Sequence, residues 1–346
     1  MMKKYSVSFN VHNIFRFRVF ASHRRFLASF EDKFAYFLSD DLEDPDIDIF
    51  LGRFELEGKE IQLNIKDAVY GRNFIQFNEF YKILKWKIAF DHLESKKWDI
   101  YCYCNLGPGY ETVITKIIRP LFSLKLALEG KSLLHGSAVA QDGEAFVLSA
   151  FPGVGKSSFS YFMQRDSSIF LADENILFGQ TGTVYSFPLS MPTTTLNLNY
   201  FDTKIKLSPR EYLHLKFGDL VQLFSRGFLE KSFPLHPEKY FRIQDQSPLG
   251  TLFIMGRSPG TMSIREIDPG MAARFLFLIN DYELMTINKH LLPYFLINRE
   301  SALQEKEEKM LNNYKNILRG KTAYYINLDQ NDMQKSFEEI KEFIQS

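Results

Sequence analysis

The residues most able to do chemistry lie in one short stretch of the sequence, Ala150-Phe151-Pro152-Gly153-Val154-Gly155-Lys156-Ser157. Two glycines, a lysine and a hydroxyl at this spacing are typical of a loop that holds phosphate groups. In such a loop successive backbone amides point inward, and the N-terminus of the next helix adds partial positive charge. Lys156 would reach the β- and γ-phosphates of a nucleotide, and the Ser157 hydroxyl would contact Mg²⁺. We therefore expect a nucleotide and its Mg²⁺ to be bound at Ala150, Phe151, Pro152, Gly153, Val154, Gly155, Lys156, Ser157 and Ser158.

The surrounding sequence supplies the strand and the helix that such a loop needs. Residues 144–149 have strand composition, and residues 158–165 have helical composition. Gly153 and Gly155 allow backbone conformations that a Cβ atom would block. Ala150 stands where the first glycine of the pattern is expected. Because alanine avoids mainly a positive φ, the loop can form if this corner is not left-handed.

An acidic pair, Asp173-Glu174, follows the apolar run 169–172, seventeen positions after Lys156. A short helix and one turn use that length, so we expect the strands before the loop and before the pair to be close neighbours in one sheet. The pair would then lie at the edge where strands deliver ligands in α/β folds. A bound Mg-nucleotide needs such acids for its metal shell and for a proton. The alternative is a pair of exposed acids in a turn.

His135 is a further candidate, because its strand leads toward the loop. Residues 133–139 and 145–149 predict a hairpin, with Gln141-Asp142-Gly143 as the turn. This hairpin could bring the imidazole near the γ-phosphate or the acidic pair, where it would steer a proton. A histidine flanked by leucines is more often a packed or capping residue, and that alternative stays open.

Composition argues against several classes of protein. The 346 residues carry 42 basic and 42 acidic side chains, and this balance gives no reason to expect a nucleic-acid or membrane partner. Cys102 and Cys104 would share one face of a strand as free thiols, which excludes a disulfide framework. The first residues lack an apolar signal core, and no run of about 18 apolar residues occurs. We expect a soluble cytoplasmic protein.

The chain predicts an α/β fold in two domains. A smaller α+β domain spans residues 1–110, and a catalytic domain spans residues 111–346, with a Gly- and Pro-rich linker at 105–109. In the smaller domain we expect strands at 5–11, 14–20, 46–51, 59–65 and 73–77 and helices at 27–38 and 80–90. In the larger domain we expect strands at 168–172, 183–187, 252–255, 262–266 and 323–328. Helical segments are expected at 112–128, 209–217, 218–225, 270–278, 301–318 and 333–344, the last capped by Asp329 or Asn331.

These residues resemble the kinase domain of HPr kinase/phosphorylase and its relatives, which have a P-loop core of the HPr kinase/PEP carboxykinase type. Some relatives phosphorylate peptides or free serine. The similarity covers Arg119-Pro120, His135-Gly136-Ser137, the hairpin, residues 150–157 and Leu171-Ala172-Asp173-Glu174. It continues more weakly through Pro192, residues 248–266 and the terminal strand and helix, which is most of residues 112–345.

The resemblance implies a role for each matching residue. The loop with Lys156 would hold ATP. Asp173 matches the acid that deprotonates the acceptor hydroxyl, and His135 matches a histidine near the reacting phosphate. Glu174 takes the place of a second aspartate that helps, with Ser157, to hold the metal. Two residues depart from the family pattern, Ala150 for glycine and Glu174 for aspartate, and no HPr-recognition signature is evident near the C-terminus.

The sequence thus favours an ATP-dependent kinase that transfers the γ-phosphate to a hydroxyl, with serine preferred, on a peptide, a protein or a small molecule. Arg226, Arg257 and Arg265 are candidates for an extra charge on the transferring phosphate. The alternatives are a P-loop ATPase or nucleotide-gated switch, in which Asp173 would hold the metal and Glu174 would activate water, and a non-catalytic nucleotide-binding relative. A homo-oligomer is also open, because related kinases often form rings or dimers.

Overall fold

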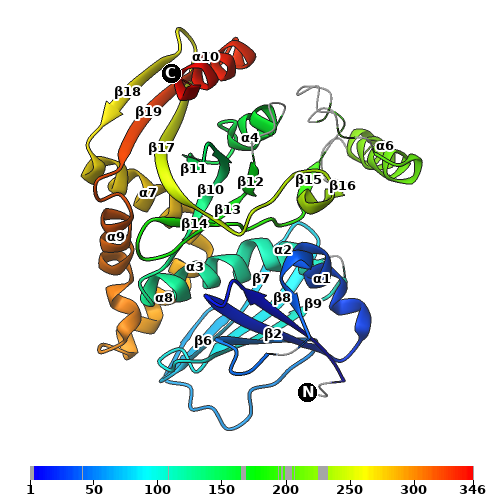
Figure 1. Ribbon diagram of the computed structural model, residues 1–346. Coiled ribbons are helices and arrows are strands. Elements are labelled where there is room, and N and C mark those ends of the chain that lie inside the picture. Colours follow the sequence, from blue (N-terminus) through cyan, green and yellow to red (C-terminus); the bar gives the residue numbers. More distant parts are fainter. Residues whose placement is uncertain are drawn as a thin grey trace. The chain divides into compact units, whose positions relative to one another are not determined.

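The computed structural model describes residues 4–40, 42–107, 109–164, 169–193, 195, 198, 205, 207–224 and 233–345 (Figure 1). The chain divides into two compact units. The first comprises Met1–Gly130 and Asp281–Met310, and the second comprises Lys131–Asn280 and Leu311–Ser346. This division differs from the predicted boundary after residue 110, because the helix after the linker and a later segment both belong to the first unit. Helices and mixed sheets in both units confirm the α/β class.

In the first unit, the described residues form one sheet of nine strands in the order β3-β1-β2-β4-β9-β8-β7-β6-β5. Neighbouring strands are antiparallel except β2, β4 and β9, which run parallel to one another. The bounds are β1 Tyr5–Val11, β2 Phe15–Ala21, β3 Leu38–Ser39, β4 Ile47–Leu51, β5 Leu63–Ile65, β6 Ala68–Gly71, β7 Phe74–Tyr81, β8 Leu84–Asp91 and β9 Trp98–Cys104. As predicted, Cys102 and Cys104 are buried free thiols on β9.

Aromatic side chains join this sheet to its helices. Phe17 stacks on Phe9 with the ring centroids 4.6 Å apart, and it lies 4.7 Å from the ring of Phe122. Phe122 belongs to a helical run that was predicted as 112–128. The run consists of α2 (Gly109–Val113), a π-helical turn (Ile114–Ile118) and α3 (Arg119–Leu128). The predicted helix at 27–38 is shorter, with α1 at Ala28–Lys33 followed by a 3-10 turn.

The predicted helix at residues 80–90 is wrong, because this segment is the turn and second strand of the β7–β8 hairpin. Lys82 has a φ of 55° at the turn. From Trp86 to Ile88 the burial alternates, with Lys87 partly exposed between two buried side chains. A period of two residues is that of a strand with one face covered.

A segment from late in the chain completes the first unit. Helix α8 (Met285–Ile297) places the His290 ring on Phe77, with the centroids 3.7 Å apart. The Nε2 atom of His290 lies 2.9 Å from Glu79 Oε1. The Tyr294 hydroxyl donates to Glu94 Oε1 at 2.7 Å. These contacts hold residues 281–310 against parts of the first unit that lie some 200 positions earlier in the sequence.

In the second unit, the described residues form an eight-stranded mixed sheet in the order β11-β10-β13-β14-β17-β19-β18. Strand β12 pairs with β10 off this path, and β11 also pairs with β17. The bounds are β10 Ser132–Gln141, β11 Glu144–Ser149, β12 Ile169–Ala172, β13 Asn175–Phe178, β14 Thr183–Tyr185, β17 Gln246–Ser258, β18 Ser263–Ile267 and β19 Thr322–Asp329. A separate pair consists of β15 (Met191–Thr193) and β16 (Phe233–Leu235).

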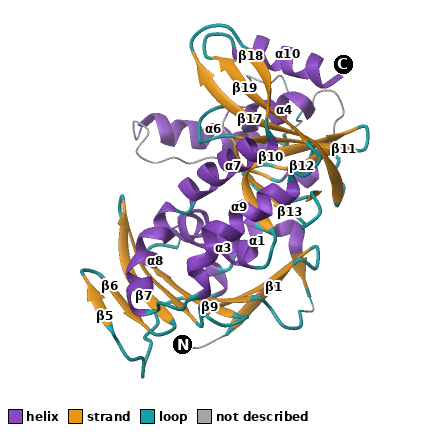
Figure 2. Ribbon diagram, turned by 90° about the vertical axis from the view of Figure 1, so that its left-hand side faces the viewer, coloured by secondary structure: helices purple, strands orange, loops and turns teal. Residues whose placement is uncertain are grey.

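Helices contact both faces of this sheet (Figure 2). Tyr324 and Tyr325 follow each other on β19 and therefore point to opposite faces. The Tyr324 ring contacts Phe343 of α10 (Met333–Gln345) at 4.9 Å, and the Tyr325 ring contacts Phe275 of α7 (Pro269–Glu283) at 6.1 Å. Helix α4 (Lys156–Gln164) packs on the same face as α10, where Phe159 meets Phe337 at 5.4 Å.

Three further expectations about helices are corrected. The predicted helical pieces at 209–217 and 218–225 are one helix, α6 (Pro209–Phe224). The cap of α10 is Asp332 rather than Asp329 or Asn331, since Asp332 Oδ1 accepts from the Lys335 amide at 3.0 Å. The predicted segment at 301–318 is a 3-10 turn followed by α9 (Lys306–Ile317). Within the described residues, no helix has the length and apolar character to cross a membrane.

Candidate functional site

The predicted hairpin is confirmed and leads directly into the glycine-rich loop. Strands β10 and β11 pair from Gly136↔Ser149 to Gln141↔Glu144. The two residues between them, Asp142 and Gly143, have φ values of 53° and 86°, which suits a tight hairpin turn of the primed type. Strand β11 ends at Ser149 and α4 begins at Lys156, so the loop occupies the junction between strand and helix that the motif requires.

The two glycines of the loop have left-handed backbone conformations. Gly153 has a φ of 82°, and Gly155 has a φ of 122°. A Cβ atom on Gly155 would lie 2.8 Å from Met333 Cε, so α10 packs closely against the loop at this point. Ala150 is fully buried and does not have a positive φ. Alanine in place of the expected glycine therefore causes no backbone strain at this corner.

Lys156 is folded back over the loop. Its ammonium group donates to the carbonyl oxygen of Ala150 at 3.0 Å and to that of Phe151 at 3.3 Å, and the residue is only 6% exposed. The amide of Phe159 donates to Gly155 O at 3.0 Å. The amides of the three preceding residues begin the helix, where amides have no intrahelical acceptor. Donors of this kind beside a buried cation favour binding of an anion.

The structure brings Ser157 and Asp173 together. The Ser157 hydroxyl donates to Asp173 Oδ1 at 2.8 Å. The strands before them are not direct neighbours, because β10 lies between β11 and β12. Ala138 of β10 pairs with Val147 on one side and with Ala172 on the other. The hydrogen bond spans this gap because α4 lies over β10.

The environment of Asp173 raises its pKa to about 6. Burial is the largest cause, since the residue is 3% exposed, and the negative charge of Glu174 adds to it. The hydrogen bond from Ser157 and the charge of Lys156 act in the opposite direction. A carboxylate with a pKa near neutrality is suited to accept and release a proton at physiological pH.

Glu174 has a left-handed backbone, with a φ of 67°. A residue with a Cβ atom adopts this conformation at a cost of roughly 1 kcal/mol or more. Its carbonyl oxygen accepts from the Gly136 amide at 3.3 Å. Backbone strain of this kind recurs at functional sites.

His135 lies on the same face of the sheet as the loop. Its neighbour two positions on, Ser137, donates to the carbonyl oxygen of Lys156 at 3.2 Å, and alternate residues of a strand share a face. The backbone carbonyl of His135 accepts from the Ser149 hydroxyl at 2.9 Å. Asn175 lies directly opposite His135 in the β10–β13 register, so the two side chains are neighbours on that face.

Sequence reasoning missed three polar residues around this site. Ser137 bonds the start of α4, and Asn175 is 7% exposed beside His135. Tyr161 is buried, with its hydroxyl 3.4 Å from Thr193 Oγ1, and the negative charges of Asp173 and Glu174 add to the rise of its pKa that burial causes. Ser137 was named only as part of the matching segment His135-Gly136-Ser137, and the alternation along β10 could have indicated that it shares a face with His135.

The three candidate arginines have different positions. Arg226 lies outside the described residues. Arg265 places its guanidinium 4.9 Å from the Tyr325 ring, which is the face that carries α7 and not α4. Arg257 pairs with Leu328, whose Cδ1 lies 3.8 Å from the Cβ position of Gly155. Arg257 therefore shares the face and the strand edge of the loop, and of the two arginines within the described residues it is the better placed candidate.

The donor set suits a magnesium-bound triphosphate. Among the described residues, no group of three His, Cys, Asp or Glu side chains could hold a metal ion. Mg²⁺ commonly takes only one or two protein oxygen ligands and completes its shell with water and substrate phosphates. The Ser157 hydroxyl and the carboxylates of Asp173 and Glu174 are hard oxygen donors of this kind.

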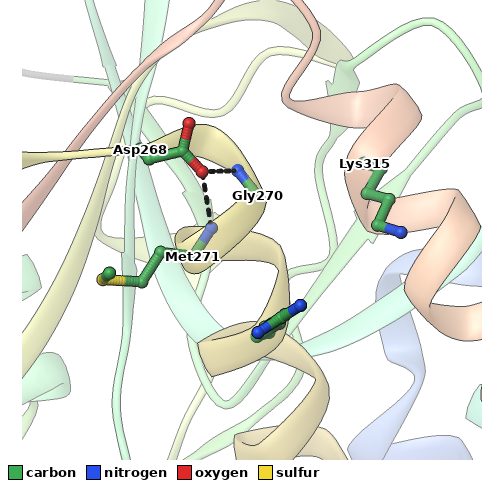
Figure 3. Close-up of a pocket in the computed structure, with 5 residues that line it drawn as sticks. Asp268, Gly270, Met271 and Lys315 are labelled. Carbon is green, nitrogen blue, oxygen red and sulfur yellow. Dashed lines mark hydrogen bonds between the residues drawn. The ribbon is translucent and has the colours of Figure 1, made fainter.

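A pocket of about 310 Å³ lies elsewhere in the second unit, between the first turns of α7 and the last turn of α9 (Figure 3). Asp268 Oδ1 accepts there from the amides of Gly270 and Met271 at 2.8 and 3.0 Å. Arg274 and Lys315 also line the pocket. Because α7 covers the face opposite α4, this pocket is separate from the loop.

Comparisons with known proteins leave the assignment to the geometry of the site, since no protein-family model matches this chain and no curated protein matches it.

Proposed function

We propose that the second unit is an ATP-dependent kinase of the HPr kinase type, which transfers the γ-phosphate to a hydroxyl, with serine preferred, on a peptide, a protein or a small molecule. The observation that carries the proposal is the hydrogen bond of 2.8 Å between Ser157 at the end of the loop and the buried Asp173. It joins the group suited to hold the metal with the group suited to accept a proton.

The residues have distinct roles in this proposal. Lys156 and the amides at the start of α4 bind the phosphates and neutralise the charge that develops during transfer. Asp173 takes the proton from the acceptor hydroxyl, and its pKa of about 6 keeps most of it ionised at pH 7.5. His135 and Arg257 are placed on the same face as the loop to orient or neutralise the transferring group. Mg²⁺, when bound by Ser157 and Glu174, would offset the charge of the phosphates.

The first experiment measures transfer from labelled ATP to a panel of acceptors, namely free serine, serine-containing peptides and the protein itself. Replacing Asp173 by Asn should lower transfer by roughly 10²–10⁴-fold, which is the usual contribution of a positioned base. Asp142→Asn is a matched control, because this exposed aspartate lies at the tip of the hairpin turn. Equal transfer by the wild type and Asp173→Asn would remove Asp173 as the base.

The second experiment separates a kinase from an ATPase. In an ATPase Glu174 would activate water, so Glu174→Gln should bind ATP yet stop hydrolysing it. In a kinase the same substitution should act mainly through a weaker affinity for Mg²⁺. Calorimetry with MgATP, on the wild type and on Lys156→Met, tests binding by itself. If the wild-type protein binds no MgATP, both the kinase and the ATPase proposals are refuted.

A further inference from the structure

Helix α6 exposes a wide apolar stripe. Its described side chains include six large apolar ones that are between 48% and 80% exposed, namely Tyr212, Leu213, Phe217, Leu220, Leu223 and Phe224. At about 100° per residue, these six fall within roughly 140° of the helix circumference. Leu213, Phe217, Leu220 and Phe224 follow the spacing of four, three and four that lines one side of a packed helix pair. Both ribbon views show α6 at the edge of the second unit (Figures 1 and 2).

The opposite side of α6 already fixes the helix to its own unit. Leu215 is 1% exposed and Gly218 is buried. Glu211 accepts from the Tyr240 hydroxyl at 2.9 Å, and Asp219 accepts from the amide of Thr195 at 3.3 Å. The exposed stripe is therefore not the face by which the helix is anchored, and exposed apolar surface of this size commonly marks an interaction site.

We propose that α6 pairs with α6 of a second copy of this chain in an antiparallel arrangement about a twofold axis. A fully exposed large apolar side chain presents roughly 200 Å², so the six side chains offer on the order of 700–800 Å² per copy. A stable interface buries about 800 Å² on each partner. The stripe alone thus supplies nearly the area that a stable dimer needs.

Charges within and beside the stripe favour the antiparallel arrangement. Lys216 lies within the stripe, between Leu223 and Leu220, and Asp219 lies just beyond the edge nearest to it, whereas Arg210 and His214 lie beyond the other edge. In an antiparallel twofold pair each edge meets the same edge of the other helix. With the axis near residues 217 and 218, Lys216 faces Asp219 of the partner subunit twice. A parallel pair would instead bring Lys216 toward the basic edge, where like charges repel.

The dimer is tested by light scattering on the full-length protein, at concentrations from about 1 to 50 μM. The wild type should be a dimer, and Phe217→Glu should raise the dissociation constant by about 30-fold or more, as expected for a central apolar contact. The matched control is Leu292→Glu on α8, because Leu292 is 67% exposed and belongs to another apolar surface with Met285 and Leu296. This control should remain dimeric, and circular dichroism verifies that both variants fold.

Several results would overturn the proposal. These are a monomeric wild type at 50 μM, a dimer that is insensitive to Phe217→Glu, or a dimer that Leu292→Glu weakens equally. If the wild type is monomeric and its binding to vesicles of phosphatidylcholine and phosphatidylglycerol is lost in Phe217→Glu, the stripe belongs to a membrane surface instead.

Cross-linking tests the orientation, since the native Cys102 and Cys104 are buried and do not interfere. Phe217→Cys lies beside the proposed axis, so its two copies should form an intersubunit disulfide rapidly. Leu223→Cys is the control, because at 1.5 Å per residue its two copies lie roughly 16 Å apart along an antiparallel pair. Equal cross-linking at both positions would indicate a parallel pair and refute the antiparallel arrangement.

Discussion

The burial of Asp173 predicts that Asp173→Asn stabilises the second unit while it removes the proposed base. In the folded protein the pKa of Asp173 is raised from 3.8 to about 6, so the folded state binds the proton more tightly than the unfolded state. Ionisation of Asp173 therefore costs stability above pH 6, and this cost disappears as the pH falls toward 4. By linkage the cost is about 3 kcal/mol at pH 8 and about 1.5 kcal/mol at pH 5.

Asparagine has no charge to desolvate, and its side-chain oxygen can still accept from Ser157. Its amide nitrogen must find a partner in a buried position, which offsets part of the gain, but that offset does not change with pH. The difference in unfolding free energy between variant and wild type should therefore be about 1.5 kcal/mol larger at pH 8 than at pH 5. This corresponds to a gain in Tm that is roughly 3–6 °C larger at pH 8.

Urea unfolding followed by circular dichroism at the two pH values measures this difference directly. Asp142→Asn serves as the control, because Asp142 is exposed and the same change of residue there removes no buried charge. A stabilisation by Asp173→Asn that is equal at pH 5 and pH 8, or a loss of stability at pH 8, would refute the reasoning about burial. The result is independent of whether any acceptor has been found.

Three further predictions follow from the backbone and from buried thiols. Gly155→Ala should destabilise the second unit by at least about 2 kcal/mol, because residue 155 has a φ of 122° and the new Cβ atom would press on α10. Gly153→Ala should cost only about 1 kcal/mol, since no atom lies within 4 Å of the new Cβ position. Urea unfolding compares the two variants. Glu174→Gly should raise the unfolding free energy by about 1 kcal/mol through relief of its left-handed backbone, and a lower melting temperature would count against strain there. Burial raises the pKa of both Cys102 and Cys104, so neither thiol should react with maleimide at pH 7.5 until urea is added, as mass spectrometry would show.

The sequence predicted the elements around the loop well, because local signals there agree with the tertiary structure. Asp142 and Gly143 suit the tight turn, and the apolar runs on either side pair as expected. The spacing of the motif predicted that the acidic pair would lie near the loop, and Asp173 accepts a hydrogen bond from Ser157 there. The insertion of β10 between the two strands could not be predicted, because strand order depends on long-range pairing and not on local composition.

Two other expectations differ from the structure for identifiable reasons. Residues 80–90 contain enough helix-forming residues to suggest a helix, yet the alternation around Trp86 and Ile88 and the packing of β8 between β7 and β9 decide the structure. The boundary at residue 110 relied on a glycine- and proline-rich segment. The described residues of that segment, 105–107 and 109, lead into α2, and the first unit continues beyond them to Gly130. The functional roles of Asp173, Glu174 and His135 stay predictions, since geometry alone tests proximity and not chemistry.

The return of residues 281–310 to the first unit has a consequence for how the chain is made. The strand that carries Phe77 leaves the ribosome long before the helix that carries His290. The Phe77 ring therefore lacks this packing partner while about two hundred further residues are translated. The intervening stretch includes most of the other unit, which can begin to fold first. Any fragment that ends before residue 281 lacks this cover. Expression of either unit by itself therefore requires a gene that joins the two separate segments of that unit, because a simple truncation cannot produce it.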